Sequence, residues 1–379
     1  MRYCRGRKVM MRNDTFRKSL VVAIIVLFIC MSIKTSIGTK VIKKSTLPIS
    51  NGNTLYVGGS GPGNYTSIQD AINDANTDST VFVFAYSSPY YENVVVNKSI
   101  NLIGENKDTT IIDGNHSGNC VYVTADYVDI SGFTIQNGKF WGIYLETIFN
   151  RITDNNILNN EDKGIALFYS SGNTIIGNTI LNNLYEGINL YRSNYNTING
   201  NTILNNLGDG ISLHESNRNT ITDNIISNNE DGIRLGLKNG GYSAYNTITG
   251  NNITSNKEKG IKLYEYTDIN IIYHNNFINN TQNAYNEGNN TWDDGKYGNY
   301  WSDYEERYPD AKKKPLRGIW DTPYEILGGE NKDRCPLIKQ WPKTRTRNTQ
   351  YQTIAHPVFH WFLERFPLPE AVVSRIINL

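Results

Sequence analysis

Isoleucine, asparagine and glycine recur in a fixed order through the middle of the chain. The segment "ITDNNILNNEDKGIAL" at residues 152–167 returns as "IIGNTILNNLYEGINL" and as "INGNTILNNLGDGISL". A period of about 23 residues is typical of a solenoid, in which each copy buries its apolar face only against its neighbours. Copies of the phrase begin at Ile152, Ile175, Ile198, Ile221, Ile248 and Ile272, so one step is longer than the rest.

Within each copy the apolar positions alternate with polar ones. Each copy ends in Gly-Ile-x-Leu or a close variant, which predicts a short strand with one buried face. Asparagine recurs two residues before the opening isoleucine and again three residues after it, where the chain is expected to turn. These asparagines are Asn150, Asn173, Asn196, Asn219, Asn246 and Asn270, and Asn155, Asn178, Asn201, Asn224, Asn251 and Asn275.

Short strands in stacked copies predict an all-β fold, a right-handed single-stranded parallel β-helix. Successive coils then lie about 4.8 Å apart, and equivalent side chains form rows, isoleucine inside and asparagine at the turns. A buried asparagine amide can donate to one coil and accept from the next. A leucine-rich repeat has an overlapping period, but its signature needs leucine at several positions where this chain has mostly isoleucine.

The same pattern divides the chain into five regions. The segment "NYTSIQDAINDA" at residues 64–75 has apolar residues at helical spacing, and we expect a short helix over the open N-terminal end of the coil. Basic residues before the apolar run 20–33 are typical of an export signal, either cleaved or kept as an anchor. The predicted regions are the signal (1–38), the N-terminal cap (51–80), the β-helix repeats (81–291), a small C-terminal module (292–341) and an amphipathic helical tail (342–379).

Composition limits the partners. The 379 residues carry a net charge of +1, which argues against nucleic acid as a partner. Two distant cysteines, Cys120 and Cys335, remain after the signal, and both a bridge and two free thiols are open. Glycosylation sequons of the Asn-x-Ser/Thr type occur in the exported part at Asn64, Asn97, Asn115, Asn252, Asn279 and Asn289.

Aromatic residues recur at the outward position that follows the second apolar residue of the strand. A row of rings at sheet spacing offers a platform for the apolar faces of sugars, which makes a polysaccharide or cell-envelope glycan the candidate partner. Cross-strand stacking that only stabilises the sheet explains such a row equally well. The candidates are Phe168, Tyr191, His214 and Tyr264, with Trp141 and Tyr144 one coil earlier.

Acidic residues recur in the turn before the glycine. Stacking would bring such carboxylates close to the separation found in retaining glycosidases, but any β-helix produces that spacing, and a solvated turn row is the alternative. Arg234 and Lys262, on the outward face beside this row, are the candidates for the base of a lyase-type reaction. The acidic residues are Asp162, Glu186, Asp209, Asp231 and Glu258.

Together with the repeat, the segments "NYTSIQDAI", "GNYWSDY", "DTPYEI" and "GGENKDRCPL" resemble the NosD-type family over roughly residues 51–341. The resemblance implies an exported parallel β-helix protein, similar to domains of carbohydrate-binding proteins and sugar hydrolases. It also implies either an accessory role in copper delivery to a respiratory enzyme or, as in archaeal relatives, a surface protein. Where relatives often carry an acidic calcium loop, this chain has the basic interval "EERYPDAKKKPLRGIW", which argues against calcium there.

The ligands that copper prefers are scarce. All four methionines lie within residues 1–31, and the five histidines, His116, His214, His274, His356 and His360, fall in different coils or in the tail. No cofactor is therefore predicted, although copper and calcium both stay open. The tail has two apolar helical faces separated by Pro367 and Pro369, and we consider both docking onto the coil and anchoring to a membrane surface or partner protein.

Three functions fit these patterns. The first is a non-enzymatic, exported cell-surface protein that binds a glycan or has a structural role in the envelope. The second is a periplasmic accessory protein in copper delivery. The third is a polysaccharide lyase or glycoside hydrolase, so whether the chain is an enzyme is left open.

Overall fold

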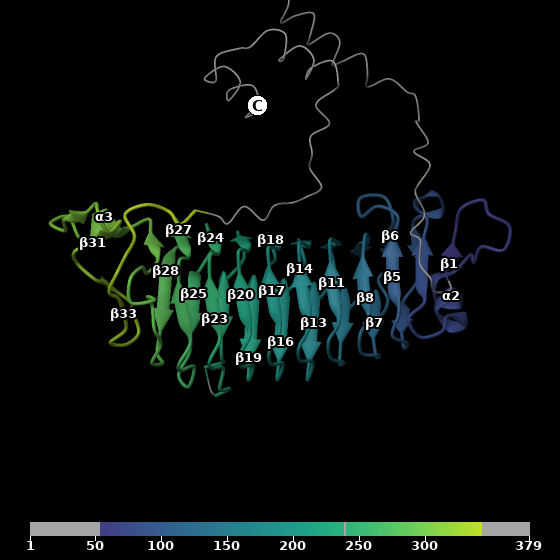
Figure 1. Cartoon of the computed structure of the whole chain (residues 1–379), viewed down its shortest axis with the longest axis horizontal. Helices are drawn as coiled ribbons and strands as arrows, with labels where there is room; N and C mark the ends of the chain where they lie inside the picture. The colour runs from purple at the N-terminus through teal and green to yellow at the C-terminus, as the bar shows by residue number, and fades with distance from the viewer. Residues whose placement is uncertain (1–53, 239, 343–379) are drawn as a thin grey trace, which may run out of the picture. The chain divides into compact units, whose positions relative to one another are not determined.

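A computed structural model describes residues 54–238 and 240–342. Most of its strands belong to three long parallel sheets, and a typical coil contributes one strand to each sheet. The coils follow one another in a single direction from the N-terminal to the C-terminal end (Figure 1). The fold is a parallel β-helix, as predicted. Strands that are neighbours in a sheet are therefore about one repeat apart in sequence.

The three sheets are called sheet A, sheet B and sheet C. Sheet A contains β1 (Thr54–Val57), β2 (Thr80–Val83), β5 (Asn101–Gly104), β8 (Asp129–Ser131), β11 (Arg151–Thr153), β14 (Thr174–Ile176), β17 (Thr197–Asn199), β20 (Thr220–Thr222), β23 (Thr247–Thr249) and β26 (Ile271–Tyr273). Sheet B contains β3 (Tyr90–Tyr91), β6 (Ile111–Asp113), β9 (Thr134–Gln136), β12 (Asn156–Leu158), β15 (Thr179–Leu181), β18 (Thr202–Leu204), β21 (Ile225–Ser227), β24 (Asn252–Thr254), β27 (Asn276–Ile278) and β29 (Tyr300–Trp301). Sheet C contains β4 (Val94–Val96), β7 (Val121–Val123), β10 (Ile143–Leu145), β13 (Ile165–Phe168), β16 (Ile188–Tyr191), β19 (Ile211–His214), β22 (Ile233–Leu235), β25 (Lys259–Leu263) and β28 (Gln282–Asn286).

The core consists of three rows of apolar side chains, one from each sheet. Ile198 of sheet A pairs in register with Ile175 and Ile221, and all three are fully buried. Ile203 of sheet B and Ile211 of sheet C are buried in the same way. Burying one such side chain stabilises the fold by roughly 1.5–3 kcal/mol, and the period repeats this contribution in every coil.

The predicted asparagine rows are hydrogen-bonded ladders. Asn178 donates its backbone N–H and its side-chain amide to Oδ1 of Asn201, at 3.0 and 3.1 Å, and Asn201 donates in the same way to Asn224. A second amide hydrogen bond reaches a buried carbonyl, as from Asn178 to Ile152 at 2.8 Å. A third asparagine ladder runs through Asn160, Asn183 and Asn206, and a serine ladder that we did not predict runs through Ser170, Ser193 and Ser216.

Both ends of the described coil are covered. At the N-terminal end α2 (Ile68–Asp74) packs Ile68, Ala71 and Ile72 into the core, and Ser67 caps the helix by accepting the N–H of Asp70 at 3.3 Å. This is the predicted capping helix. At the C-terminal end Trp301 stacks on Phe277 with ring centroids 4.6 Å apart, so an aromatic pair closes the core.

The C-terminal residues add short elements to this aromatic end. They are α3 (Tyr304–Arg307) and the hairpins β30 (Lys313–Lys314) with β31 (Ile319–Trp320) and β32 (Tyr324–Glu325) with β33 (Lys332–Asp333). A 3-10 turn, η1 (Ala85–Ser87), lies near the N-terminal end, between β2 and β3. Tyr324 stacks on Trp301 at 4.1 Å, which joins this region to the coil. The helical tail and the signal predicted from the sequence lie outside the described residues. In the part of the chain that the structure covers, no helix is long and apolar enough to span a bilayer.

The two cysteines are free thiols, which settles the alternative left open by the sequence. Cys120 and Cys335 are both buried and neither is bridged. Burial raises the pKa of the Cys120 thiol to about 12, so this thiol stays protonated and unreactive at neutral pH. Its Sγ donates to the carbonyl of Gln136 at 3.0 Å.

Candidate functional site

The outward face of sheet C carries the predicted candidate residues in three parallel columns. The column before the glycine contains Trp141, Lys163, Glu186, Asp209, Asp231 and Lys259. The middle column, between the two inward apolar residues, contains Tyr122, Tyr144, Ala166, Asn189, Ser212, Arg234, Lys262 and Tyr285. The outer column contains Glu146, Phe168, Tyr191, His214, Gly236 and Tyr264.

Six rings from these columns form one continuous series, which we call the aromatic strip. It consists of Tyr122, Trp141, Tyr144, Phe168, Tyr191 and His214, all of them half-buried. Consecutive centroids lie 5.1 Å apart for Tyr122 and Tyr144, 4.2 Å for Tyr144 and Trp141, 5.5 Å for Trp141 and Phe168, 5.4 Å for Phe168 and Tyr191, and 5.0 Å for Tyr191 and His214. The strip spans five consecutive coils. Tyr122 was not predicted, because its coil precedes the regular repeat.

Trp141 and Tyr144 reach the strip from columns other than the one that holds Phe168. Trp141 lies before its glycine and Tyr144 lies in the middle column, yet both rings contact Phe168. Two of the three tyrosines of the strip donate their hydroxyl groups to the carboxylate of Glu146, Tyr122 at 2.5 Å and Tyr144 beside it. This shared acceptor fixes the N-terminal end of the strip.

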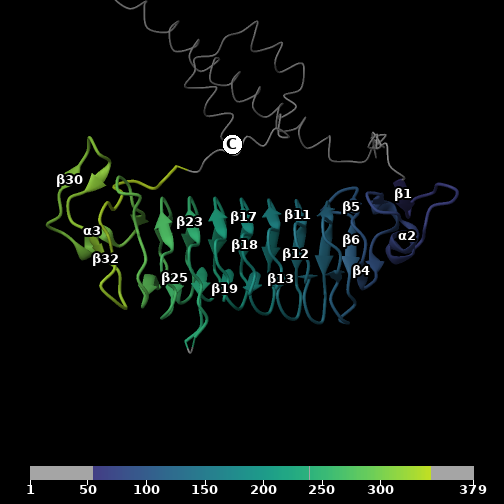
Figure 2. The ribbon, with the colours of Figure 1, turned by 60° about the horizontal axis from the view of Figure 1, so that its bottom comes forward.

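The structure does not bring Tyr264 into the strip. Gly236 stands between His214 and Tyr264 in the outer column and contributes no ring. The loop of the long repeat step also projects beyond the neighbouring turns there (Figure 2) and packs Gly241 against His214, where a Cβ atom would lie 2.4 Å from Cδ2. The Tyr264 ring instead lies 4.7 Å from Nζ of Lys262.

Three of the five predicted acidic residues form a true column. Glu186, Asp209 and Asp231 each directly precede a glycine, and their backbone carbonyls or amides join consecutive coils. Asp162 and Glu258 lie one position earlier in the chain, two residues before their glycines. They form ion pairs with the residues that follow them, Lys163 at 2.8 Å and Lys259 at 3.7 Å. The prediction of one row of five was therefore wrong in register.

Arg234 bridges two of these carboxylates. Its Nε lies 2.7 Å from Oδ2 of Asp209 and its Nη2 lies 3.3 Å from Oε1 of Glu186. Ser212 Oγ accepts from both Nε and Nη2, at 3.4 and 3.3 Å. Lys262 lies beside Asp231, with Nζ 3.9 Å from Oδ2. Both cations thus stand where the sequence predicted them, but the guanidinium is held by two acids and a hydroxyl group.

Burial changes the protonation of this acidic column. It raises the pKa of Asp209 to about 7, against the opposing charge of Arg234 and with the help of Asp231 and Glu186. Burial also raises the pKa of Asp231, which Lys262 and the N–H of Lys259 oppose. A carboxyl group that titrates near neutral pH can donate or accept a proton, so the column has one feature of an acid-base site.

The described residues do not assemble a metal site. Among residues 54–238 and 240–342 no three His, Cys, Asp or Glu side chains gather closely enough to hold an ion. His116 pairs with Glu161 at 2.7 Å, His214 lies at the end of the strip, and His274 stacks on Trp341 at 3.4 Å. The acidic column pairs with cations rather than converging on one point, so it does not fit calcium either.

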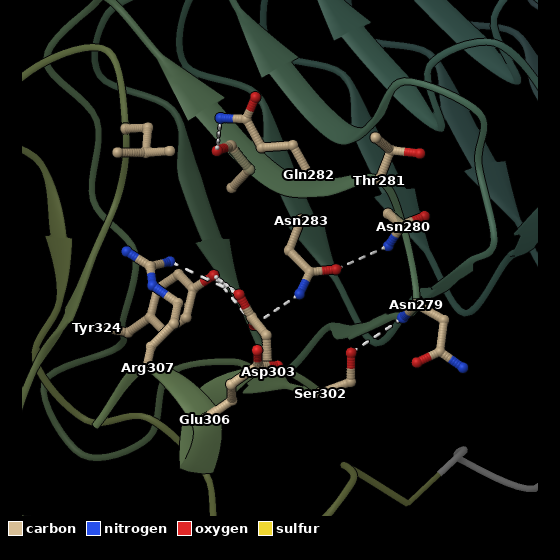
Figure 3. Close-up of a pocket in the computed structure, with 12 residues that line it drawn as sticks. Asn279, Asn280, Thr281, Gln282, Asn283, Ser302, Asp303, Glu306, Arg307 and Tyr324 are labelled. Carbon is tan, nitrogen blue, oxygen red and sulfur yellow. Dashed lines mark hydrogen bonds and ion pairs between the residues drawn. The ribbon is translucent and has the colours of Figure 1, made fainter. Parts of the chain in front are cut away.

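A polar cavity of about 410 Å³ lies at the C-terminal end of sheet C (Figure 3). Asp303 lies at its centre and accepts hydrogen bonds from Asn283 Nδ2 at 2.7 Å and from the Tyr324 hydroxyl group at 2.9 Å. Arg307 adds a guanidinium with Nη1 3.8 Å from Asp303. These contacts use the carboxylate internally, so the cavity has a structural explanation.

The comparisons with known proteins agree with this fold. The family model described as "Periplasmic copper-binding protein (NosD)" matches residues 42–240 and 185–306, which together cover more than half of the chain. The chain belongs to the NosD family. A cell surface glycoprotein of Methanothermus fervidus is 34% identical to this NosD-family chain over 97 residues, which are 25% of the chain and 16% of that relative. Both descriptions are of proteins outside the cytoplasm, and the chain is an exported β-helix protein.

The comparison with solved structures gives one that shares the fold. The pectate lyase Pel9A has a TM-score of 0.50 and 17% identity, over 64% of the NosD-family chain and 73% of its own. Tailspike protein 2 of Escherichia coli O157:H7 bacteriophage CAB120 has a TM-score of 0.47 and 14% identity, over 64% and 38% of the two chains. At these identities the likeness to Pel9A concerns the fold alone.

Proposed function

We propose that this NosD-family protein binds a glycan strand along the aromatic strip and acts as a non-enzymatic protein of the cell surface. The observation that carries the proposal is the unbroken contact of six half-buried rings over five coils. Ring faces and edges favour the apolar C–H faces of sugars, as they favour other apolar groups. The repeat of about 4.8 Å between coils lets one extended chain meet successive rings.

The side chains beside the rings support the same proposal. In the coils where the strip runs along the outer column, the middle column holds only short side chains, those of Ala166, Asn189 and Ser212. These short side chains, which are themselves buried, stand between the rings of the outer column on one side and the column before the glycine, with Lys163, Glu186 and Asp209, on the other. A sugar ring above them can stack on one flank and exchange hydrogen bonds with the other. Pel9A, a pectate lyase and so an enzyme that acts on a polysaccharide, has the same fold.

Affinity electrophoresis of the full chain in gels that contain a panel of polysaccharides tests the proposal. Replacing Phe168 and Tyr191 together by Ala should weaken retention by roughly tenfold or more, since each ring contact contributes about 0.5–1.5 kcal/mol. Tyr91→Ala is the matched control, because Tyr91 is 67% exposed on sheet B, away from the strip. Equal retention of the double variant and the control would contradict the proposal, provided that circular dichroism shows both to be folded.

A catalytic function is the second candidate, and the raised pKa of Asp209 is the observation that favours it. The carboxyl group holds a proton near neutral pH and lies 2.7 Å from Arg234, a combination suited to proton transfer. The same incubations report on it: a lyase or hydrolase would shorten the polysaccharide, and Asp209→Asn would stop the shortening. Retention without shortening supports binding alone.

A further inference from the structure

A second line of aromatic side chains runs along the corner where sheet C turns into sheet A. In several coils two residues at this corner have a positive φ. A first line, directly after the strand, holds Tyr169, Arg192 and Glu215, and a second line, three residues later, has φ between 57° and 73°. We call this second line the corner stripe. It consists of Tyr127, Phe149, Gly172, Tyr195, Arg218, Tyr245 and Ile269. These residues follow one another coil by coil through backbone hydrogen bonds, such as that from Arg218 N to Ala244 O at 3.1 Å.

The other two corners of the same coil provide an internal comparison. Between sheets A and B the positive-φ residues are Gly132, Asp154, Gly177, Gly200, Asp223, Gly250 and His274. Between sheets B and C they are Asn137, Asn159, Asn182, Asn205, Asn228, Ser255 and Asn279. Glycine, asparagine and aspartate are the residues that tolerate this left-handed backbone, whereas bulky side chains are disfavoured there. The aromatic residues of the corner stripe are therefore not explained by the turn that they form.

Packing within the stripe accounts for only part of these rings. Tyr127 and Phe149 stack at 5.5 Å, and the Phe149 ring covers Gly172. Even so, Tyr127 is 66% exposed, Phe149 50%, Tyr195 59% and Tyr245 47%. About half of each ring thus remains in solvent although the backbone disfavours it, which is the combination expected of a binding surface.

Arg218 gives the stripe its charge. Its Cζ lies 5.5 Å from the centre of the Tyr195 ring and 5.3 Å from that of Tyr245, and its Nη1 donates to the Tyr195 hydroxyl group at 2.8 Å. Arg192, at the same corner three residues before Tyr195, is also flanked by two tyrosines, but Glu215 neutralises it at 2.5 Å. Among the residues that the structure describes, no carboxylate pairs with Arg218.

We propose that the corner stripe binds an acidic polysaccharide, whose sugar carboxylates pair with Arg218 while its rings contact the exposed aromatic side chains. A guanidinium recognises a carboxylate through two parallel N–H donors, and here it is held between two exposed rings. That the ligand is a polysaccharide rests on the proposed function, but the corner stripe is a different surface from the aromatic strip.

The shape of the stripe favours a linear polymer over a protein partner. The stripe is one residue wide and is flanked by half-buried polar side chains, Ser171, Asn194 and Asn217 on one side and the threonines at 174, 197 and 220 on the other. A stable protein interface buries about 800 Å² on each partner around an apolar centre, which a single line of side chains does not provide. Hydroxyl and amide groups beside rings instead match the hydroxyl groups of sugars.

The test compares polygalacturonate with its fully methyl-esterified form, which share a backbone and differ in the carboxylate. The full chain should bind the acid form about three- to tenfold more tightly than the ester at low salt, and the difference should shrink in 0.5 M salt, as expected for partly exposed ion pairs (roughly 8 Å screening length at physiological salt). Arg218→Ala should remove the difference and leave binding of the ester unchanged. Arg317→Ala, an exposed arginine of the C-terminal module, is the charge-matched control.

A second variant removes the rings without endangering the turn. Tyr195→Asn with Tyr245→Asn inserts the residue that the same chain uses at Asn182 and Asn205 with equal backbone geometry. The double variant should keep or raise the thermal midpoint and weaken binding of the acid form about threefold or more. Tyr91→Asn is the control.

The outcomes separate this inference from the proposed function. Equal binding of both polymers, with no effect of Arg218→Ala, would overturn the corner stripe even if the Phe168 and Tyr191 changes abolish retention. Preference for the acid form that survives Arg218→Ala would also overturn it. Retention of no polysaccharide at all would overturn both.

Discussion

Asp333 accepts the backbone N–H of Asn299 at 2.7 Å, so a buried carboxylate receives the last donor of an asparagine ladder. In this ladder each asparagine donates toward the C-terminal end, from Asn155 to Asn178 and finally from Asn275 to Asn299 at 3.0 Å. A stack with one direction of donation ends in donors that need an acceptor from outside the coil. Trp301 Nε1 and the backbone N–H of Cys335 donate to the same carboxylate, each at 2.9 Å.

The other two ladders end in the same way. The ladder that contains Asn270 passes to Asn290, whose N–H donates to Asn331 Oδ1 at 3.0 Å. The third passes from Asn280 to Asn283 and then to Asp303, at 3.1 and 2.7 Å. The residues after the last coil therefore have a definite role, which is to supply the terminal acceptors. This explains why Asp303 lies in a cavity with its oxygens already occupied.

Replacement of Asp333 by Ala should destabilise the protein strongly. Three buried N–H donors lose their acceptor, at a cost of about 1–3 kcal/mol each, so we expect a loss of about 3–5 kcal/mol. Thermal unfolding followed by circular dichroism measures it. Asp310→Ala, at an exposed position of the same region, should change stability by less than about 0.5 kcal/mol. Equal midpoints for the two variants would refute the terminal-acceptor role.

Stability should fall as the pH rises from about 4 to about 7. Burial raises the pKa of Asp209 to about 7, so within this range the folded protein keeps a proton that the unfolded chain has released. The contribution of this group to the free energy of unfolding is therefore largest below pH 4. It decreases by up to about 4 kcal/mol between pH 4 and pH 7 and stays constant above that range. Asp333, whose pKa burial also raises to about 7, contributes in the same direction.

Urea unfolding of the wild-type chain and of Asp209→Asn at pH 5 and pH 8 checks this expectation. Asparagine resembles the protonated acid but does not titrate, so the variant should lose part of the difference in midpoint between the two pH values. Asp310→Asn is the control, because an exposed carboxylate should leave the difference as it is. A wild-type protein that is more stable at pH 8 than at pH 5 would show that other groups dominate.

Of two asparagines in one coil, one should be sensitive to substitution and the other should tolerate it. Asn201→Ala leaves the backbone N–H and the amide of Asn178 without their acceptor and the carbonyl of Ile175 without its donor, so we expect a loss of about 3–5 kcal/mol. Asn205 is exposed with φ of 56°, and glycine adopts that backbone freely, so Asn205→Gly should stay within about 0.5 kcal/mol of the wild type. Thermal midpoints that shift equally would contradict the division into ladder and corner asparagines.

The period made the core and the ladders predictable. Ile198 and Asn201 recur at fixed offsets, and stacking at constant register turns such recurrence directly into contact. The candidate site was less predictable, because it depends on what varies between copies. Tyr264 satisfied the pattern but the inserted loop and Gly236 separate it from His214, while a shift of one residue removes Asp162 from the column of Glu186.

The backbone conformation of the corner residues is not visible in the repeat pattern. Tyr195 and Asn205 occupy corners of the same backbone conformation, but the sequence alone does not reveal that both have a positive φ. Only the comparison of the three corners shows that the positive φ explains the choice of asparagine and does not explain the choice of tyrosine. In the same way the acceptors Asp303 and Asp333 lie outside the repeat, so no periodicity pointed to them.

Copper is the metal that the name of the NosD family connects with these proteins. His116, His214 and His274 lie in different coils, and each contacts an aromatic or acidic neighbour rather than another histidine or a cysteine. A tight copper site needs two or more soft or imidazole ligands at one point. We therefore expect that Cu(I) titration of the full chain, read by competition with a chromophoric chelator, gives the same uptake for the wild type and for His116→Ala, His214→Ala and His274→Ala. Stoichiometric uptake that disappears in any one of these variants would place a copper site within the coils and favour the copper-delivery function.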